Sequence, residues 1–123
     1  MRPRIINLPQ ITDERGNLSF FESQRQVPFN ISSVKWLTGF IPDIYETKNI
    51  SEFLVSVSGQ ITFQYSEQGV TEVFTLDSPK IGLYIPKKCT LKKISEDPCT
   101  LVVACNGLAA EKTNQSAAPW SKI

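Results

Sequence analysis

Hydrophobic residues along this chain occur in short runs that alternate with polar residues, and turn-forming residues separate the runs. Ile61, Phe63 and Tyr65 alternate with polar neighbours, which is the period of a strand with one buried face. No segment has a sustained helical period of apolar residues. The pattern predicts strands at Arg4–Leu8, Asn17–Glu22, Ser33–Thr38, Glu52–Val57, Gln60–Tyr65, Thr71–Leu76, Gly82–Ile85, Thr90–Ile94 and Thr100–Cys105.

The clearest hairpin joins Phe53–Val57 to Ile61–Tyr65 through Ser58 and Gly59, because glycine permits the positive φ that such a turn needs. Many short strands without helices leave a sandwich, a jelly roll or a barrel. We expect an all-β jelly roll with about nine or ten strands. Its edge strands need covering, and Arg4–Leu8 is a candidate to do so, on its own sheet or on another protomer.

Length and composition indicate a single globular domain. The chain has 123 residues, 41% of them hydrophobic and 20% charged. We expect one domain over residues 1–110, followed by a tail of small and polar residues at 111–123. The net charge of +1 gives no reason to expect a nucleic-acid or membrane partner.

The lack of a targeting signal and the pattern of cysteines predict a protein of the cytoplasm. No apolar run approaches the roughly 20 residues that span a bilayer, and Ile5–Leu8 is too short for a signal peptide. The three cysteines are an odd number without C-x-x-C spacing, so neither a disulfide framework nor a zinc site is implied. Cys105 ends the apolar run Leu101–Cys105, and we expect it to be buried.

The chain contains no histidine, yet its middle is similar to a cupin. Tyr45-Glu46-Thr47, Glu52 and Gly59 have the spacing of the first cupin motif, in which two histidines, a glutamate and a glycine recur. Both histidine positions are filled by other residues. In the second motif, Leu91 takes the place of the last histidine ligand. One carboxylate without imidazole or thiolate partners is not a credible Zn or Fe site, so we expect no metal and no other cofactor.

A more specific resemblance rests on three stretches, Ile5–Phe20, Leu54–Gly59 and Phe74–Pro86. They contain D-x-R-G-x-L-S-F and L-D-S-P-x-x-G-L-Y-I-P, and in this order they closely resemble the sugar 3,4-ketoisomerases. These are WxcM-like cupins that act on dTDP-4-keto-6-deoxyglucose in the biosynthesis of unusual deoxysugars for surface polysaccharides. The resemblance implies a metal-free jelly-roll barrel with an internal site, and a homodimer formed by exchange of N-terminal strands.

The chain departs from this family at the positions that carry its chemistry. Family members move protons with a histidine pair in an R-G-x-H-A-H-K motif, helped by tyrosines on the preceding strand. The loop Gly39–Ile41 before that motif is several residues shorter here. Pro42 stands in place of the family's arginine, and Tyr45 and Thr47 stand in place of its two histidines. Lys35 and Trp36 replace the two tyrosines, and Cys89 replaces a tryptophan. Such a joint loss is expected of a paralogue that has given up isomerisation.

Five residues remain candidates for ligand contact: Arg15, Lys35, Tyr45, Thr47 and Glu52. The family's corresponding arginine can lie near the phosphates of the sugar nucleotide. We favour instead a simple turn, which Asp13 caps, in which Gly16 supplies the positive φ and Arg15 pairs with a carboxylate.

Tyr45 and Glu52 could form a new acid–base pair, but both would need large pKa shifts to work near neutrality. We favour a Tyr45 that fills the volume of the absent histidine and hydrogen-bonds inside the barrel. Lys35 could serve as a base if burial lowered its pKa. Trp36 could stack on a nucleobase, but we favour a place for it in the core.

Three functions fit these observations. We favour an inactive or diverged cupin, which binds a nucleotide sugar or acts as an accessory subunit, with or without an active paralogue as its partner. The second is an active sugar-nucleotide isomerase with a rebuilt, histidine-free site. The third is an assembly protein whose barrel is filled by side chains.

Overall fold

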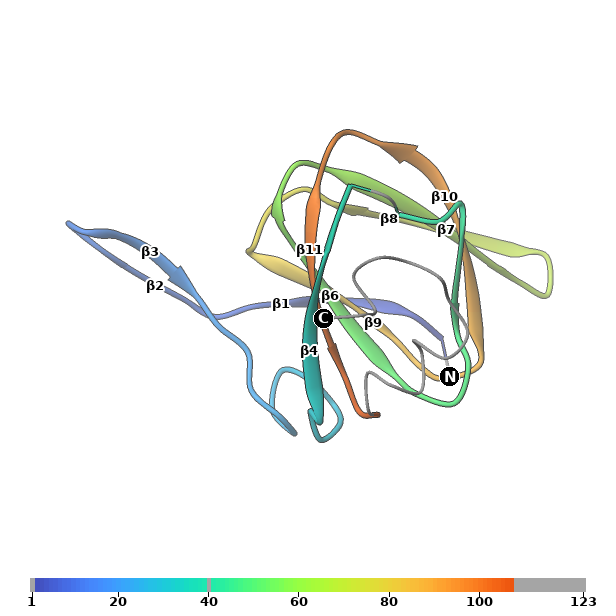
Figure 1. Cartoon of the computed structure of the whole chain (residues 1–123), viewed down its shortest axis with the longest axis horizontal. Helices are drawn as coiled ribbons and strands as arrows, with labels where there is room; N and C mark the ends of the chain where they lie inside the picture. The colour runs from blue at the N-terminus through green and yellow to red at the C-terminus, as the bar shows by residue number, and fades with distance from the viewer. Residues whose placement is uncertain (1, 40, 108–123) are drawn as a thin grey trace.

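The computed structural model describes residues 2–39 and 41–107 (Figure 1). All the regular elements in these two ranges are strands. They are β1 (Arg4–Asn7), β2 (Gln10–Asp13), β3 (Gly16–Ser19), β4 (Ser33–Thr38), β5 (Ile44–Thr47), β6 (Glu52–Ser58), β7 (Ile61–Glu67), β8 (Val70–Leu76), β9 (Ile81–Ile85), β10 (Cys89–Glu96) and β11 (Thr100–Cys105).

The strands form two facing antiparallel sheets and one separate hairpin. The larger sheet has the order β1-β9-β6-β11-β4, and the smaller has the order β5-β10-β7-β8. In Figure 1 the strands β7, β8 and β10 form the layer that lies across β4, β6, β9 and β11. This arrangement is the all-β jelly roll that the turn spacing predicts.

Inward-facing side chains of both sheets form a single core between them. Ile61, Phe63 and Tyr65 of β7 are buried, as their alternation predicts. The core consists of Leu37, Ile41, Tyr45, Leu54, Ile61, Phe63, Tyr65, Phe74, Leu76, Leu83, Ile85, Cys89, Leu91, Cys99, Leu101 and Val103.

The outer face of the larger sheet is covered by the segment 20–31. Phe21 packs edge-on against Phe53 with ring centroids 5.2 Å apart, and Phe29 lies 6.1 Å from Tyr84. Because β6 is covered on both faces, its first five residues are all buried, which explains why Phe53, Leu54 and Val55 are consecutively apolar. The predicted strand Asn17–Glu22 therefore ends early, at Ser19, and its remainder belongs to this covering segment.

Two short strands were not predicted from the sequence, so the described strands number eleven rather than nine or ten. All four residues of β2 are exposed, so it has no buried face to produce alternation. The buried positions of β5 are Tyr45 and Thr47, and the polar threonine obscures the pattern.

The prediction that Trp36 lies in the core is wrong, because this side chain is 61% exposed. Alternate residues of a strand point to opposite faces, and Leu37 of β4 is the buried neighbour. Lys35 therefore shares the inward side with Leu37, whereas Trp36 lies outside with exposed Val34.

The N-terminal strand covers an edge, as expected, and it does so within its own chain. β1 pairs with β9 from Arg4↔Tyr84 to Asn7↔Ile81. The hairpin β2–β3 then extends away from the barrel (Figure 1). The predicted tail at 111–123 lies outside the described residues. Within 2–39 and 41–107, no helix is long and apolar enough to cross a membrane.

The three cysteines are free and buried, and the expected burial of Cys105 is confirmed.

Gly59 allows a direct test of the packing at one end of the barrel. It has a φ of 75°, and an added Cβ would collide with the Pro98 carbonyl and with Cys99. Gly59→Ala should lower the free energy of unfolding by about 3 kcal/mol, because it adds a clash to the cost of a left-handed backbone. Gly69→Ala is the control: its φ is 80°, but nothing lies within 4 Å of the added atom. It should cost about 1 kcal/mol. Equal losses in urea denaturation would contradict the tight contact at Gly59.

Candidate functional site

The barrel interior contains a hydrogen bond between Tyr45 of β5 and Glu52 of β6. The Tyr45 hydroxyl donates to the Glu52 carboxylate at 2.5 Å, and Glu52 has no exposed surface. The tyrosine ring also packs edge-on against Phe63, with ring centroids 5.6 Å apart. Tyr45 thus packs and hydrogen-bonds inside the barrel at a position where the family motif has histidine.

Burial raises the pKa of Tyr45, and the nearby Cys105 thiol raises it further. A buried phenolate is costly, so the neutral phenol is favoured. The phenol can therefore donate its proton to the bond with Glu52 but is a poor proton acceptor near neutral pH. This arrangement suits a structural hydrogen bond better than general acid–base chemistry.

Thr47, at the second histidine position, ties β5 to the start of β10. Its buried hydroxyl donates to the carbonyl of Pro86 at 2.5 Å and accepts from the Cys89 amide at 3.0 Å. A threonine hydroxyl does not ionise near neutral pH, and this one is engaged by two backbone groups. Thr47 therefore holds the strands in register.

Lys35 is the third interior candidate. It lies half-buried on β4, and burial lowers the pKa of its ammonium group. The Cys105 thiol contributes to the pKa shifts of both Lys35 and Tyr45, and its sulfur lies 2.9 Å from the Ser33 hydroxyl. The interior thus contains Lys35, Tyr45, Thr47 and Glu52, all four of the candidates drawn from the barrel strands.

Arg15 lies apart from the other candidates, at the tip of the β2–β3 hairpin. Its side chain is 88% exposed and pairs with Asp13, with 2.8 Å between Nη2 and Oδ2. The Arg15 amide also donates to Oδ1 of Asp13 at 2.8 Å, and Gly16 has a φ of 132°. Arg15 holds the pKa of the Asp13 carboxyl below its usual range. Within one chain this is the simple turn that the sequence left as an alternative to phosphate contact.

Lys93 of β10 was not among the candidates from the sequence, but its side chain has a specific structural role. It is only 14% exposed, and its ammonium group contacts Glu96 at 2.8 Å, the Ile41 carbonyl at 2.7 Å and Asp43 at 3.4 Å. These contacts fasten the segment before β5 to β10, and Ile41 of that segment is fully buried. The only signal of these contacts in the sequence was Glu96, which is opposite in charge to Lys93 and follows it by three residues.

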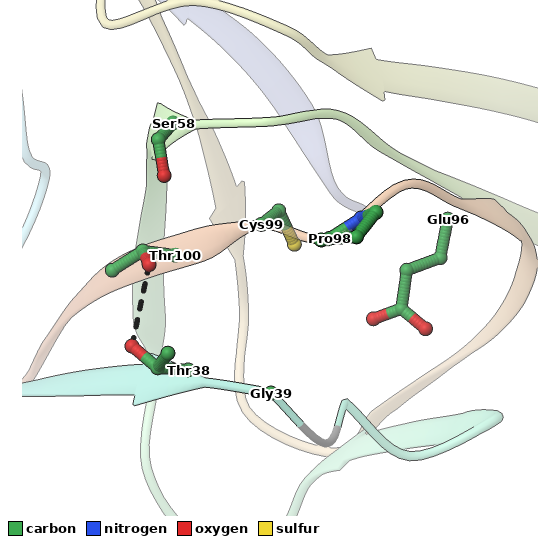
Figure 2. A pocket seen from close by; sticks show the side chains of 7 residues that line it. All are labelled: Thr38, Gly39, Ser58, Glu96, Pro98, Cys99 and Thr100. Carbon is green, nitrogen blue, oxygen red and sulfur yellow. Dashed lines mark hydrogen bonds between the residues drawn. The ribbon is translucent and has the colours of Figure 1, made fainter.

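The structure also has a hollow at one end of the barrel, which the sequence did not predict. It has a volume of about 580 Å³, and Figure 2 shows the side chains that line it. Because they come from three separate places in the chain, no single sequence motif reveals them. They are Thr38, Gly39, Ser58, Glu96, Pro98, Cys99 and Thr100. Among residues 2–39 and 41–107, no group of three or more histidine, cysteine or acidic side chains could hold a metal ion.

Comparison with known proteins defines the family. The family model described as "FdtA: WxcM-like, C-terminal" matches residues 1–112. The chain belongs to the WxcM-like family. The resemblance to sugar 3,4-ketoisomerases that the motifs indicate is thereby confirmed.

Individual relatives agree with this assignment. The chain is 30% identical over 89 residues to the TDP-4-oxo-6-deoxy-alpha-D-glucose-3,4-oxoisomerase of Aneurinibacillus thermoaerophilus, a match that covers 69% of this chain and 64% of that enzyme. The chain thus spans just under two thirds of the length of this curated relative.

Solved structures show the same cupin fold. The WlaRB TDP-quinovose 3,4-ketoisomerase of Campylobacter jejuni is 29% identical, with a TM-score of 0.72 over 86% of this chain and 85% of that one. A mutant of the QdtA 3,4-ketoisomerase of Thermoanaerobacterium thermosaccharolyticum, in complex with TDP-4-keto-6-deoxyglucose, is 21% identical, with a TM-score of 0.70 over 87% of this chain and 81% of that one. At 21% identity, this second likeness supports the fold alone.

The buried hydrogen bond of Tyr45 can be tested through stability. Tyr45→Phe keeps the ring but removes a donor from the buried Glu52 carboxylate, and we expect a loss of about 2 kcal/mol in the free energy of unfolding. Tyr65→Phe is the matched control, since that hydroxyl donates to Glu67 over 3.3 Å in a part-buried bond. It should cost less than about 1 kcal/mol. A Tyr45→Phe variant as stable as the wild type would contradict a structural role for the bond.

Proposed function

We propose that this chain is a non-catalytic member of the WxcM-like family that binds a TDP-sugar, alone or as an accessory subunit in deoxysugar and polysaccharide biosynthesis. The names of two relatives support the ligand class, since one acts on TDP-4-oxo-6-deoxyglucose and the other on TDP-quinovose. An active isomerase that works on the same sugar would be the natural partner of such a subunit.

The observation that carries the proposal is the buried bond between Tyr45 and Glu52. Moving a keto group to the neighbouring carbon needs an acid and a base whose pKa values lie near neutrality. Tyr45 donates to Glu52 at 2.5 Å and has a raised pKa, while Thr47 is engaged by two backbone groups. Neither residue supplies the proton transfer that a histidine pair would supply.

One observation favours the alternative of a rebuilt active site. Burial lowers the pKa of Lys35, which is the direction that a lysine base requires. The third function, an assembly protein with a filled barrel, is favoured by the continuous apolar core between the two sheets. Binding and turnover measurements separate the three.

The wild-type protein should leave TDP-4-keto-6-deoxyglucose unchanged. A general acid–base step contributes about 10²–10⁴-fold to the rate, and this chain lacks the groups that perform it. We expect no solvent deuterium to enter the sugar during hours of incubation in heavy water, followed by proton NMR. The Campylobacter jejuni ketoisomerase serves as the positive control with its own substrate. Calorimetric binding of the same nucleotide sugar supports the proposal, turnover overturns it in favour of the rebuilt enzyme, and absence of binding favours the assembly protein.

Histidines placed at both family positions should not restore activity. In Tyr45→His/Thr47→His, the segment before β5 stays fastened to β10 by Lys93, and Lys35 still faces inward. The substrate would therefore lack the contacts that orient it, and we expect no deuterium incorporation from a variant whose thermal unfolding shows that it is folded. Turnover by this variant would mean that the rest of the site is intact.

We also propose a homodimer joined through N-terminal segments. The β2–β3 hairpin extends from the barrel and exposes Ile11 and Leu18, a cross-strand pair, while Trp36 and Val34 are exposed on the edge strand β4. Exposed apolar surfaces on a projecting element and on a sheet edge suit contact with a second copy.

Light scattering after size exclusion should give the mass of a dimer at micromolar concentration. Ile11→Asp/Leu18→Asp should give the mass of a monomer, because it places two charges in the proposed contact. Val73→Asp is the control, an exposed apolar position on β8, and it should stay dimeric. A monomeric wild type would overturn the proposed assembly.

A further inference from the structure

The hollow at the end of the barrel lies far from the Tyr45–Glu52 bond. Glu52 is the first residue of β6 and Ser58 is the last, so they are separated by about 20 Å along the strand. Thr38 is the last residue of β4, and Thr100 is the first residue of β11. Thr100 pairs with Thr38 on one side and with Ser58 on the other. The hollow is therefore a separate feature from the interior positions discussed above.

One wall of this hollow is formed by the turn at Gly59 and the turn at Pro98, which pack against each other. Gly59 packs so closely on Pro98 and Cys99 that no side chain would fit between them. The Asp97 amide donates to the Gln60 carbonyl at 2.9 Å. The buried Ser56 hydroxyl donates to the carbonyls of Ser58 and Gly59, at 3.1 and 3.0 Å. Such a wall is organised before any ligand arrives, which reduces the entropic cost of binding.

Gly39 lies on the opposite side. It has a φ of 90°, and among the described residues other than its chain neighbours nothing lies within 4 Å of the position where its Cβ would be. Figure 2 shows Thr38 and Gly39 on one side and Pro98, Cys99 and Glu96 on the other, with the Glu96 carboxylate pointing into the space between them. A volume of about 580 Å³ lies within the range of small-molecule sites, about 300–1,000 Å³.

The groups around the hollow favour a ligand that offers hydroxyl groups. Thr38, Ser58 and Thr100 supply hydroxyls, and the first and last of these already approach each other at 3.3 Å. Glu96 supplies a carboxylate, which accepts hydrogen bonds. Burial raises the pKa of the Cys99 thiol and Glu96 raises it further, so the cysteine remains neutral here.

The same groups disfavour a phosphate. Lys93 pairs with Glu96, and its ammonium group also contacts Asp43 and the Ile41 carbonyl. An ammonium group has three N–H donors, so these contacts use its capacity. The described lining residues include no lysine or arginine, so the hollow offers no cationic side chain of its own to an anion.

We propose that this hollow is a binding site for a neutral, polyhydroxylated ring of the size of a hexopyranose. The hydroxyls and the carboxylate bond its hydroxyl groups, and Pro98 lies against its apolar face. The site is independent of the proposed TDP-sugar function, because it lacks the positive charge that a diphosphate needs and lies at another part of the barrel.

Two-dimensional amide NMR of isotopically labelled full-length protein tests the site, with methyl α-glucopyranoside and methyl α-fucopyranoside as probes. We expect saturable shift changes in the millimolar range at Thr38, Ser58, Cys99 and Thr100. Thymidine diphosphate alone should leave these four amides unchanged. This probe separates the site from nucleotide binding elsewhere in the protein.

Two variants make the test specific. Ser58→Trp should abolish the shift changes by filling the hollow, while Val73→Trp, on exposed β8, should leave them intact. Thr38→Val/Thr100→Val keeps the shape but removes two hydroxyls, so it tests the chemistry even if the tryptophan variant unfolds. We expect it to weaken binding at least tenfold. No shift change with either glycoside, unchanged binding in the threonine double variant, or a stronger response to thymidine diphosphate would each overturn the proposal.

Discussion

The Glu52 carboxylate lies between two sheets without exposed surface, and this burial constrains the positions around it. Burying a carboxyl group is costly unless hydrogen bonds replace its water. The Tyr45 hydroxyl meets this need on β5, and Thr47 on the same strand fastens the start of β10. The residues that stand where the family motif has histidines are therefore engaged in hydrogen bonds inside the barrel and contribute to its stability.

Much of the fold could be predicted because the relevant signals are local. Alternation identified β7, and the Ser58–Gly59 turn identified the β6–β7 hairpin. The side assigned to Trp36 was wrong, because both sides of β4 carry apolar residues and only pairing with β11 decides which of them face the core. The inward side of this strand holds Lys35, which the sequence named as a candidate without being able to place it.

The candidate site was only partly predictable, for a related reason. Tyr45, Thr47 and Glu52 lie close in sequence, so a family motif could point to them. The contacts of Lys93 join β10 to a loop about fifty residues earlier in the chain. The hollow is lined by residues at or next to the ends of β4, β6 and β10 and at the start of β11. Such contacts depend on how strands pair across the barrel, which composition and spacing do not encode.

The protonation of Tyr45 tests the central claim most directly. Carbon NMR of protein labelled at tyrosine Cζ, assigned with Tyr45→Phe, reports whether the hydroxyl ionises. The structure predicts that Tyr45 remains a phenol at pH values of about 10 and above, where an ordinary tyrosine has begun to ionise, because burial raises its pKa. An ionisation near neutral pH would give the barrel a working acid–base group and would contradict a purely structural bond between Tyr45 and Glu52.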